Sequence, residues 1–433
     1  MKVCGILIFF FFSLVTTAPA SPLSLEDCLK IALARYPRLK ALSAKRKARE
    51  ALSEAARKDL YPRLSWKYQY TRLRDRQKIV ILGHDVPISS YEMIENNLLL
   101  EVPLFHGLAL RIKRRLRALE ADISRVEEER GRQEVAYLVK EAYFSLLEKK
   151  YHLKEAQKSV ARLKKHLKIV RAYYAEGLVA KHQVLSSEVA LAEAQHIFIL
   201  AQNQLHIAES RLNILLDRPL RAPISVEDSF QKLPPKLKSL SYYLDLAQKL
   251  RPELRIARLA CQKARENIRL AKATYYPQID LLGNYQRRGT DLWATQNPYW
   301  DRENISFTFN LRLLLWDWGK RRQEVAAARA EALAREEALR ELEKEIALQV
   351  EEAYFLFKAA RKQLEVARKA LSQAEENFRL QQSRFKEGLA ESADVLDAEA
   401  FLAAAEARLI EALANLHLSR ARLLFAVGED PYQ

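Results

Sequence analysis

The chain has 433 residues, of which 49% are hydrophobic and 29% charged, and its formal net charge is +17. These proportions and a mean hydropathy of −0.27 are typical of a water-soluble chain, so no segment beyond the N-terminus is expected to be a membrane helix. The positive charge would suit a nucleic-acid partner. However, Lys and Arg interleave with Glu, as in residues 340–345, which is typical of solvated helix faces, and we expect no nucleic-acid partner.

The N-terminal segment has the pattern of a secretory signal peptide. Lys2 precedes an apolar run at residues 6–15, and Ala18-Pro19-Ala20 places small residues at the cleavage positions. The apolar run is too short to span a membrane as a helix. We therefore expect residues 1–20 to be removed on export, which also separates the chain from nucleic acid.

Two cysteines, Cys28 and Cys261, remain in the exported chain. They occupy non-equivalent positions, so the pattern allows a disulfide between them but gives no support for one. We expect buried free thiols.

The sequence is a duplication. Residues 139–144 match residues 350–355 at an offset of 211, and upstream Tyr61-Pro62 matches Tyr276-Pro277 at an offset of 215. A repeat of this kind outranks local propensity as a guide to architecture. It predicts two similar halves, residues 21–216 and 239–433, joined by a Pro-rich linker at residues 217–238.

Each half is expected to begin with two helices. The first helix of each half covers residues 24–36 or 239–251. It is interrupted by the proline that follows, Pro37 or Pro252. The helices that follow end at the Tyr-Pro pairs, because the residue before a proline disfavours helical geometry.

Four segments then alternate apolar and polar residues. They lie at about residues 62–74, 96–105, 277–288 and 304–315. This period of two predicts strands with one apolar face, although two soluble β-hairpins would alternate in the same way.

Aromatic residues gather at both ends of these segments, and the candidates for a membrane interface are Tyr61, Trp66, Phe105, Tyr276, Trp293, Trp300 and Trp316. Two such clusters favour a membrane barrel. Because the smallest barrels have about eight strands, a chain with four must oligomerise to close one.

Long helices follow the strands in each half. Residues 320–387 contain neither Gly nor Pro, and two interleaved seven-residue series predict a coiled-coil seam. Those series are Val350, Phe357, Leu364, Leu371, Phe378 and Phe385, and Ala353, Ala360, Ala367 and Ala374. A matching helix follows, so each half should form an antiparallel hairpin, with tips at about residues 175–182 and 386–393.

Together these patterns resemble a known family. Pro103-Leu104-Phe105 and Leu315-Trp316-Asp317 precede the long helices, and the tips read Glu176-Gly177-Leu178 and Glu387-Gly388-Leu389. In this doubled order the chain is similar to TolC-like outer-membrane efflux proteins (outer-membrane factors) over its whole exported length. The resemblance implies a mainly α fold with a small β part. Duplicated coiled-coil hairpins would form a periplasmic helical barrel, and four strands per chain would contribute to a trimeric 12-stranded outer-membrane β-barrel.

The same resemblance implies a function. It predicts the channel component of a tripartite efflux pump or type I secretion system, a passive exit duct in contact with outer-membrane lipid. The implied partners are two further copies in a homotrimer, a periplasmic adaptor (membrane fusion) protein, and an inner-membrane pump of the RND or ABC type. A secreted coiled-coil scaffold without a pore is the alternative. No phosphate-binding loop, His-Glu-x-x-His or Cys-x-x-Cys motif is present, so we expect no enzyme, no catalytic residues, no cofactor and no metal site.

The hairpin tips are the candidate docking site for the adaptor. Gly177, Leu178, Val179, Gly388 and Leu389 present small and apolar groups at the end of a coiled coil. Both glycines are also expected to terminate helices, since glycine readily adopts the left-handed conformation at that position.

Asp394 and Asp397 are the candidate pore residues. Three residues apart, they share one helix face, and their counterparts in the first half are Gln183 and Ser186. An acid in the first turn is also stabilised by the helix dipole, which gives Asp394 a structural interpretation. In relatives the matching positions form an acidic ring at a closed entrance. Phe385, Ala390 and Gln183 stand where relatives have polar or charged residues that fasten this entrance, so the sequence leaves open how it is fastened here.

Overall fold

The computed structural model describes residues 22–230, 234–235, 237–298 and 301–429. The expected signal peptide at residues 1–20 and the interface candidate Trp300 lie outside the described residues. The chain forms two compact units. The helical unit comprises Met1–Lys40, Gly131–Arg251 and Ile346–Gln433, and the sheet unit comprises Ala41–Arg130 and Pro252–Glu345.

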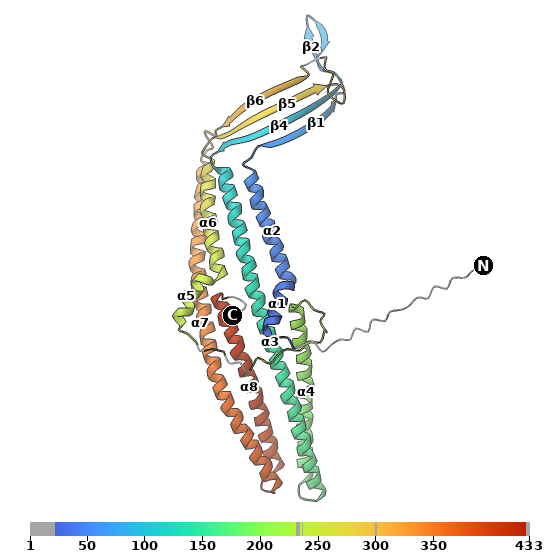
Figure 1. Ribbon diagram of the computed structural model, residues 1–433, viewed down its shortest axis with the longest axis vertical. Coiled ribbons are helices and arrows are strands. Elements are labelled where there is room, and N and C mark those ends of the chain that lie inside the picture. Colours follow the sequence, from blue (N-terminus) through green and yellow to red (C-terminus); the bar gives the residue numbers. More distant parts are fainter. Residues whose placement is uncertain (1–21, 231–233, 236, 299–300, 430–433) are drawn as a thin grey trace, which may run out of the picture. The chain divides into compact units, whose positions relative to one another are not determined.

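Apart from the short strands β2 and β3, the elements follow one another twice in the same order (Figure 1). The first half contains α1 (Leu25–Arg35), α2 (Pro37–Lys58), β1 (Arg63–Arg72), β2 (Lys78–Ile81), β3 (His84–Pro87), β4 (Glu92–His106), α3 (Ala109–Ala175) and α4 (Lys181–Leu215). The second half contains α5 (Leu240–Leu250), α6 (Pro252–Ala273), β5 (Gln278–Gly289), β6 (Glu303–Arg312), α7 (Lys320–Lys386) and α8 (Ser392–Val427). α3 and α7 each have 67 residues, so the duplicated long helices predicted from the sequence are confirmed.

Local sequence signals set the ends of the short helices. Ser24 caps α1: its Oγ accepts from the Asp27 backbone N–H at 3.1 Å, and Asp27 Oδ2 accepts from the Ser24 backbone N–H at 3.3 Å. This reciprocal pair satisfies donors that the first helical turn leaves free. The helix ends before Pro37, which begins α2.

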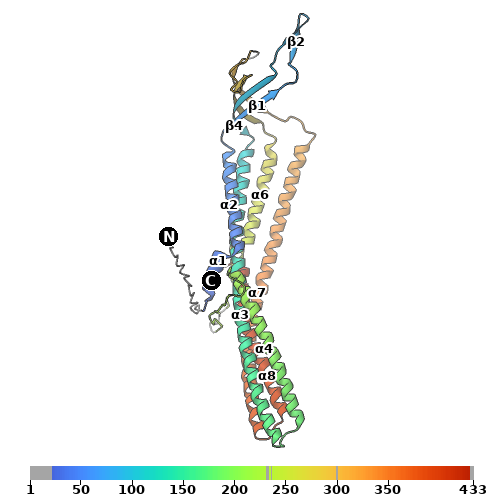
Figure 2. The ribbon, with the colours of Figure 1, turned by 90° about the vertical axis from the view of Figure 1, so that its right-hand side faces the viewer.

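The coiled-coil seam is the core of the helical unit. In α7 the buried residues include Val350, Ala353 and Phe357, and in α8 they include Val395 and Leu402. Within this unit α4 and α8 lie side by side (Figures 1 and 2). Small side chains at seven-residue spacing, Ser187, Ala194, Ala201 and Ala208, form the buried column of α4. Small residues permit close approach of two helices, as the alanine series in the sequence predicted.

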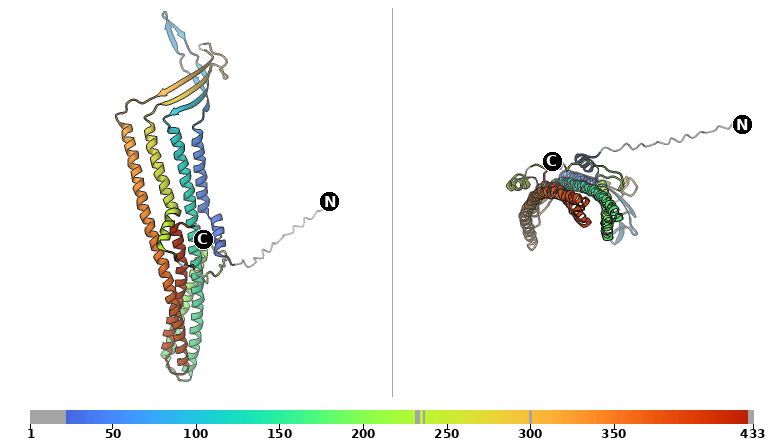
Figure 3. Two further views of the ribbon diagram at one scale, coloured as in Figure 1. Left: turned by 60° about the vertical axis from the view of Figure 1, so that its left-hand side comes forward. Right: turned by 90° about the horizontal axis from the view of Figure 1, so that it is seen from below.

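The sheet unit contains one four-stranded antiparallel sheet in the order β1-β4-β5-β6 (Figure 3). The register places Leu98 opposite both Trp66 and Tyr285, and Leu281 opposite Phe309. Directly opposed residues share a face, so the apolar residues of all four strands lie on the same side of the sheet. The four predicted strands are therefore confirmed. β1 and β6 are the edges, and each pairs on one side only within the described residues.

One β-hairpin was not predicted. β2 and β3 pair from Lys78 opposite Pro87 to Ile81 opposite His84. Leu82 and Gly83 form the turn with φ of 53° and 84°. Two positive φ values match the twist of a tight hairpin.

α4 differs from the expectation that no internal helix is long and apolar enough to span a membrane. It has 35 residues and an 18-residue window with a mean hydropathy of 1.3, of which 22% is buried. The expectation was wrong by this measure, which rests on length and composition alone. The apolar residues of α4 lie on more than one face, and several are exposed in the single chain, including Val189, Ile199 and Ile207.

Candidate functional site

The same two backbone hydrogen bonds close the turn of each helical hairpin. In the first hairpin (α3 and α4), the Gly177 backbone N–H donates to the Tyr174 carbonyl at 3.0 Å and that of Leu178 donates to the Tyr173 carbonyl at 2.9 Å. In the second hairpin (α7 and α8), Gly388 and Leu389 repeat these two bonds. Gly177 and Gly388 have φ of 76° and 75°, which explains glycine at both positions.

The tips expose two leucines, whereas Val179 and Ala390 are partly buried. The exposed fractions of Leu178 and Leu389 are 66% and 65%. Val179, by contrast, packs against the cluster formed by Val170, Phe385 and Val395. The leucines are therefore the apolar groups that a partner could reach.

Asp394 and Asp397 differ in their contacts. Asp394 Oδ2 accepts from the Glu391 backbone N–H at 2.9 Å, so this carboxylate stabilises the start of α8. Asp397, one turn further on, is exposed, and it makes no ion pair or hydrogen bond with the described part of the chain. Both carboxylates are exposed, and of the two Asp397 is the one without a structural hydrogen bond among the described residues.

An apolar cluster joins the two hairpins near their tips. Val170 of α3, Phe385 of α7 and Val395 of α8 are buried together. Phe385 stands where the family resemblance led us to note a missing polar group. Its ring lies 5.7 Å from that of Tyr173, so an aromatic contact occupies the position.

A partly buried arginine also joins the hairpins. Arg162 of α3 donates from Nε to Glu399 Oε1 at 3.0 Å, and from Nη1 and Nη2 to the two oxygens of Glu406 at 3.1 and 2.9 Å. The side chains of Glu399 and Glu406 are 6% and 11% exposed. Burial raises the pKa of Glu399, although Arg162 opposes this rise. Such a pair lends specificity to a contact and is costly to break on one side only.

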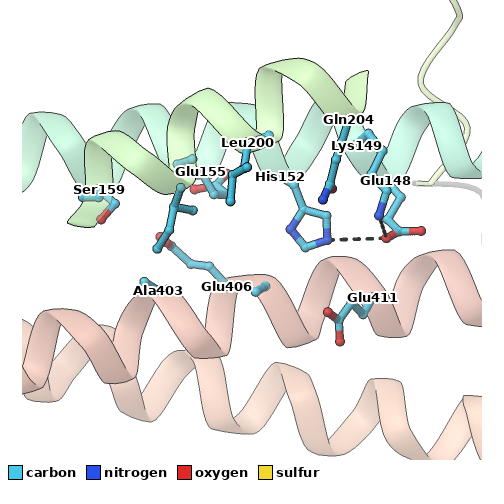
Figure 4. Close-up of a pocket in the computed structure, with 15 residues that line it drawn as sticks. Glu148, Lys149, His152, Glu155, Ser159, Leu200, Gln204, Ala403, Glu406 and Glu411 are labelled. Atoms are coloured by element: carbon cyan, nitrogen blue, oxygen red, sulfur yellow. Dashed lines mark hydrogen bonds and ion pairs between the residues drawn. The ribbon is translucent and has the colours of Figure 1, made fainter. Parts of the chain in front are cut away.

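A cavity of about 420 Å³ lies between α3, α4 and α8 (Figure 4). Glu148, His152, Glu155 and Glu411 give it acidic and titratable groups, and Ile197 and Leu200 give it an apolar wall. Glu148 accepts from Lys149 at 2.8 Å. No group of three His, Cys, Asp or Glu side chains suited to a metal ion occurs within the described ranges.

The interface aromatics lie at both ends of the sheet. Tyr61 and Tyr276 precede β1 and β5, and Phe105 and Trp316 lie where β4 and β6 adjoin the long helices. Trp293 lies in the loop from β5 to β6, at the other end. These five residues and Trp66 are exposed in the single chain.

The inter-hairpin polar residues were not identified from the sequence. The available signal was a third seven-residue column in α8, formed by Ser392, Glu399 and Glu406. All three are buried or part-buried, and all bond to α3. A polar column beside two apolar ones indicates a specific partner on the facing helix.

Comparison with known proteins identifies the family. A family model described as outer membrane efflux protein matches residues 28–217 and 243–429. Protein CyaE of Bordetella pertussis is 26% identical, over 94% of this chain and 84% of CyaE.

Two solved structures have the same fold. CusC matches with a TM-score of 0.82 at 16% identity, over 94% of this chain and 92% of CusC. VceC of Vibrio cholerae matches with a TM-score of 0.79 at 17% identity, over 94% of this chain and 96% of VceC. The family model covers both halves of the sequence. The chain therefore belongs to the outer membrane efflux protein family: it is a passive outer-membrane channel protein with a periplasmic helical part, and not an enzyme.

Proposed function

We propose that this channel is the passive exit duct of a tripartite efflux pump or type I secretion system. An inner-membrane pump of the RND or ABC type supplies the energy and delivers the substrate through a periplasmic adaptor. The observation that carries the proposal is the sheet, which has one continuous apolar face and, among the described residues, an edge strand at each side that pairs with one neighbour only.

The unpaired edges support assembly from several copies. In lipid each unpaired backbone group costs several kcal/mol, so an open sheet is not viable there. β6 of one copy can pair with β1 of the next, and repetition closes a ring. Strand number alone allows two, three or four copies, and membership of the family favours three, which gives twelve strands.

Assembly and conduction are directly measurable. Native mass spectrometry in detergent should show a trimer, and the protein reconstituted into vesicles should admit small solutes. A stable, soluble monomer that leaves vesicles sealed would support the alternative, a secreted scaffold without a pore.

The exposed tip leucines are proposed to dock the adaptor. The double variant Leu178→Asp with Leu389→Asp should abolish efflux in cells and leave trimers and conductance intact, because both side chains point to solvent. Leu220→Asp, at another exposed leucine, is the matched control and should retain efflux. Efflux at the parental level in the double variant would place the docking site elsewhere.

The remaining proposals concern processing and domain limits. We propose that residues 1–20 are an export signal, that the exported chain begins at Ser21, and that residues 217–238 link two homologous repeats. Mass spectrometry of the exported protein tests the first two points. An intact Met1 would contradict them.

A further inference from the structure

A buried chain of hydrogen bonds crosses between the two hairpins near their tips. His166 Nε2 of α3 lies 2.8 Å from Ser392 Oγ of α8, and that oxygen lies 3.1 Å from Ser187 Oγ of α4. Ser187 Oγ in turn donates to the Gln183 carbonyl at 2.8 Å. His166, Ser392 and Ser187 are 3%, 0% and 1% exposed.

Counting protons fixes the direction of this chain. The single hydroxyl proton of Ser187 goes to the Gln183 carbonyl, so Ser187 must accept from Ser392. Ser392 donates its single hydroxyl proton to Ser187, so it must accept a hydrogen bond from His166. His166 must therefore carry a proton on Nε2.

His166 is surrounded by an aromatic ring, the two serine hydroxyls and, one turn away, an ion pair. Its ring lies 5.1 Å from that of Phe385 on α7. α4 contributes Ser187, and α8 contributes Ser392 and, two turns on, Glu399. Among the described residues the charged groups beside it are Arg162, one turn away on α3, and Glu399, and these two pair with each other. No carboxylate lies in ion-pair contact with His166 in this part of the chain.

We propose that the His166–Ser392–Ser187 chain is a latch that fastens the first hairpin to the second in the closed channel, and that protonation of His166 releases it. This proposal rests on the proposed duct function. The latch joins three helices through buried groups, so the tips cannot separate without breaking it. A second proton, on Nδ1, would place a positive charge among apolar groups, and separating the hairpins would bring that charge into water.

Proton linkage gives the size and sign of the effect. Burial lowers the pKa of His166 to about 4, against about 6.5 for a solvated histidine. The pKa of His166 is higher when the hairpins are separated, so the separated state binds the proton more tightly. Separation is therefore favoured as pH falls through the pKa of the solvated histidine. The equilibrium constant for separation should therefore increase about 20-fold per protomer between pH 7 and pH 5, with a limit of about 240-fold in stronger acid.

Single-channel recording of the purified trimer in planar bilayers, from pH 7.5 to pH 4.5, tests the latch. The parent should open more often as pH falls. His166→Gln retains an N–H donor toward Ser392 but cannot become charged. This variant should match the parent at pH 7.5 and lose most of the acid response.

His417→Gln is the matched control. His417 is the other buried histidine of the helical unit with a pKa lowered to about 4, but it stacks on Phe144 and Phe230 rather than contacting Ser392. This control should keep the parental acid response.

An acid response of parental size in His166→Gln would overturn the latch. Absence of any conductance in the parent would instead contradict the proposed duct. If the variants fail to assemble, hydrogen–deuterium exchange on the parent decides the question. Protection of the first turns of α8, corrected for the intrinsic exchange rate, should fall by at least tenfold from pH 7 to pH 5. Constant protection would overturn the latch.

Discussion

Removing the partly buried arginine between the hairpins should strongly destabilise their contact. Arg162→Met takes away three charge-assisted hydrogen bonds and leaves Glu399 and Glu406 buried without their partner. Breaking one side of such a pair costs about 3–5 kcal/mol. Because the methionine preserves most of the side-chain volume, little of this loss comes from an empty space.

Hydrogen–deuterium exchange on the assembled protein is the suitable measurement, since it reports local opening. A cost of about 3 kcal/mol corresponds to a loss of protection of roughly a hundredfold or more in α8 around Glu399 to Glu406. Amides of β5, which belongs to the sheet unit, should exchange at the parental rate.

The loss of exchange protection in α8 should depend on pH. Burial already raises the pKa of Glu399, and without Arg162 only the hydrogen bond with Ser159 still opposes that rise. A carboxyl group with a raised pKa in the folded state loses stability as pH increases through that pKa. The loss of protection caused by Arg162→Met should therefore be larger at pH 7 than at pH 5.

A triple variant separates unpaired charge from lost packing. Combining Arg162→Met with Glu399→Gln and Glu406→Gln removes all three charges and should recover most of the protection. A loss below 1 kcal/mol in the single variant, or an equal loss in the triple variant, would refute the assignment of the cost to buried carboxylates.

Three further predictions follow from the described contacts. Asp397→Ala should lower cation selectivity and cation block in bilayer recordings: if three carboxylates converge to about 6 Å, each pair repels by about 3 kcal/mol at an effective dielectric near 20. Unchanged selectivity would place Asp397 against a neighbouring helix. The thiol of Cys28 is fully buried and burial raises its pKa to about 12, so it should resist maleimide at pH 7.5 until the protein unfolds. Gly107→Ala should lower the melting temperature by several degrees, because φ is 57° and the new Cβ would lie 2.5 Å from the Ala273 carbonyl oxygen. Gly177→Ala, with a φ of 76° and open space around it, should have a smaller effect.

The sequence predicted the elements whose periodicity reports burial directly. Val350 and Phe357 recur at the spacing of a helix seam and are buried on it, and Phe307 and Phe309 alternate as strand residues and share a face of the sheet. In both cases the spacing of the apolar residues in the sequence determines which side chains share one face of the helix or strand.

The features that could not be predicted depend on partners distant in the chain or on short segments. His166 and Ser392 are 226 residues apart, and neither belongs to a recognisable motif. The strands of the β2–β3 hairpin have four residues each, and their turn is Leu-Gly rather than a common hairpin pair. A run that short is too brief for alternation to be distinguished from chance.

The position of the repeats in the sheet has a consequence for how copies join. β1 and β4 belong to the first repeat and β5 and β6 to the second, so the central β4–β5 pair is the joint between repeats. The offsets of 211 and 215 residues carry β4 onto β6 and β5 onto β1. The joint between neighbouring copies should therefore repeat the internal one: Leu100 faces Gly283 within a chain, so Leu311 should face Tyr68 of the next copy. Three chains closed in this way would form a pseudo-sixfold ring of two-stranded units, in which the strand pairing within a chain and the strand pairing between chains are alike.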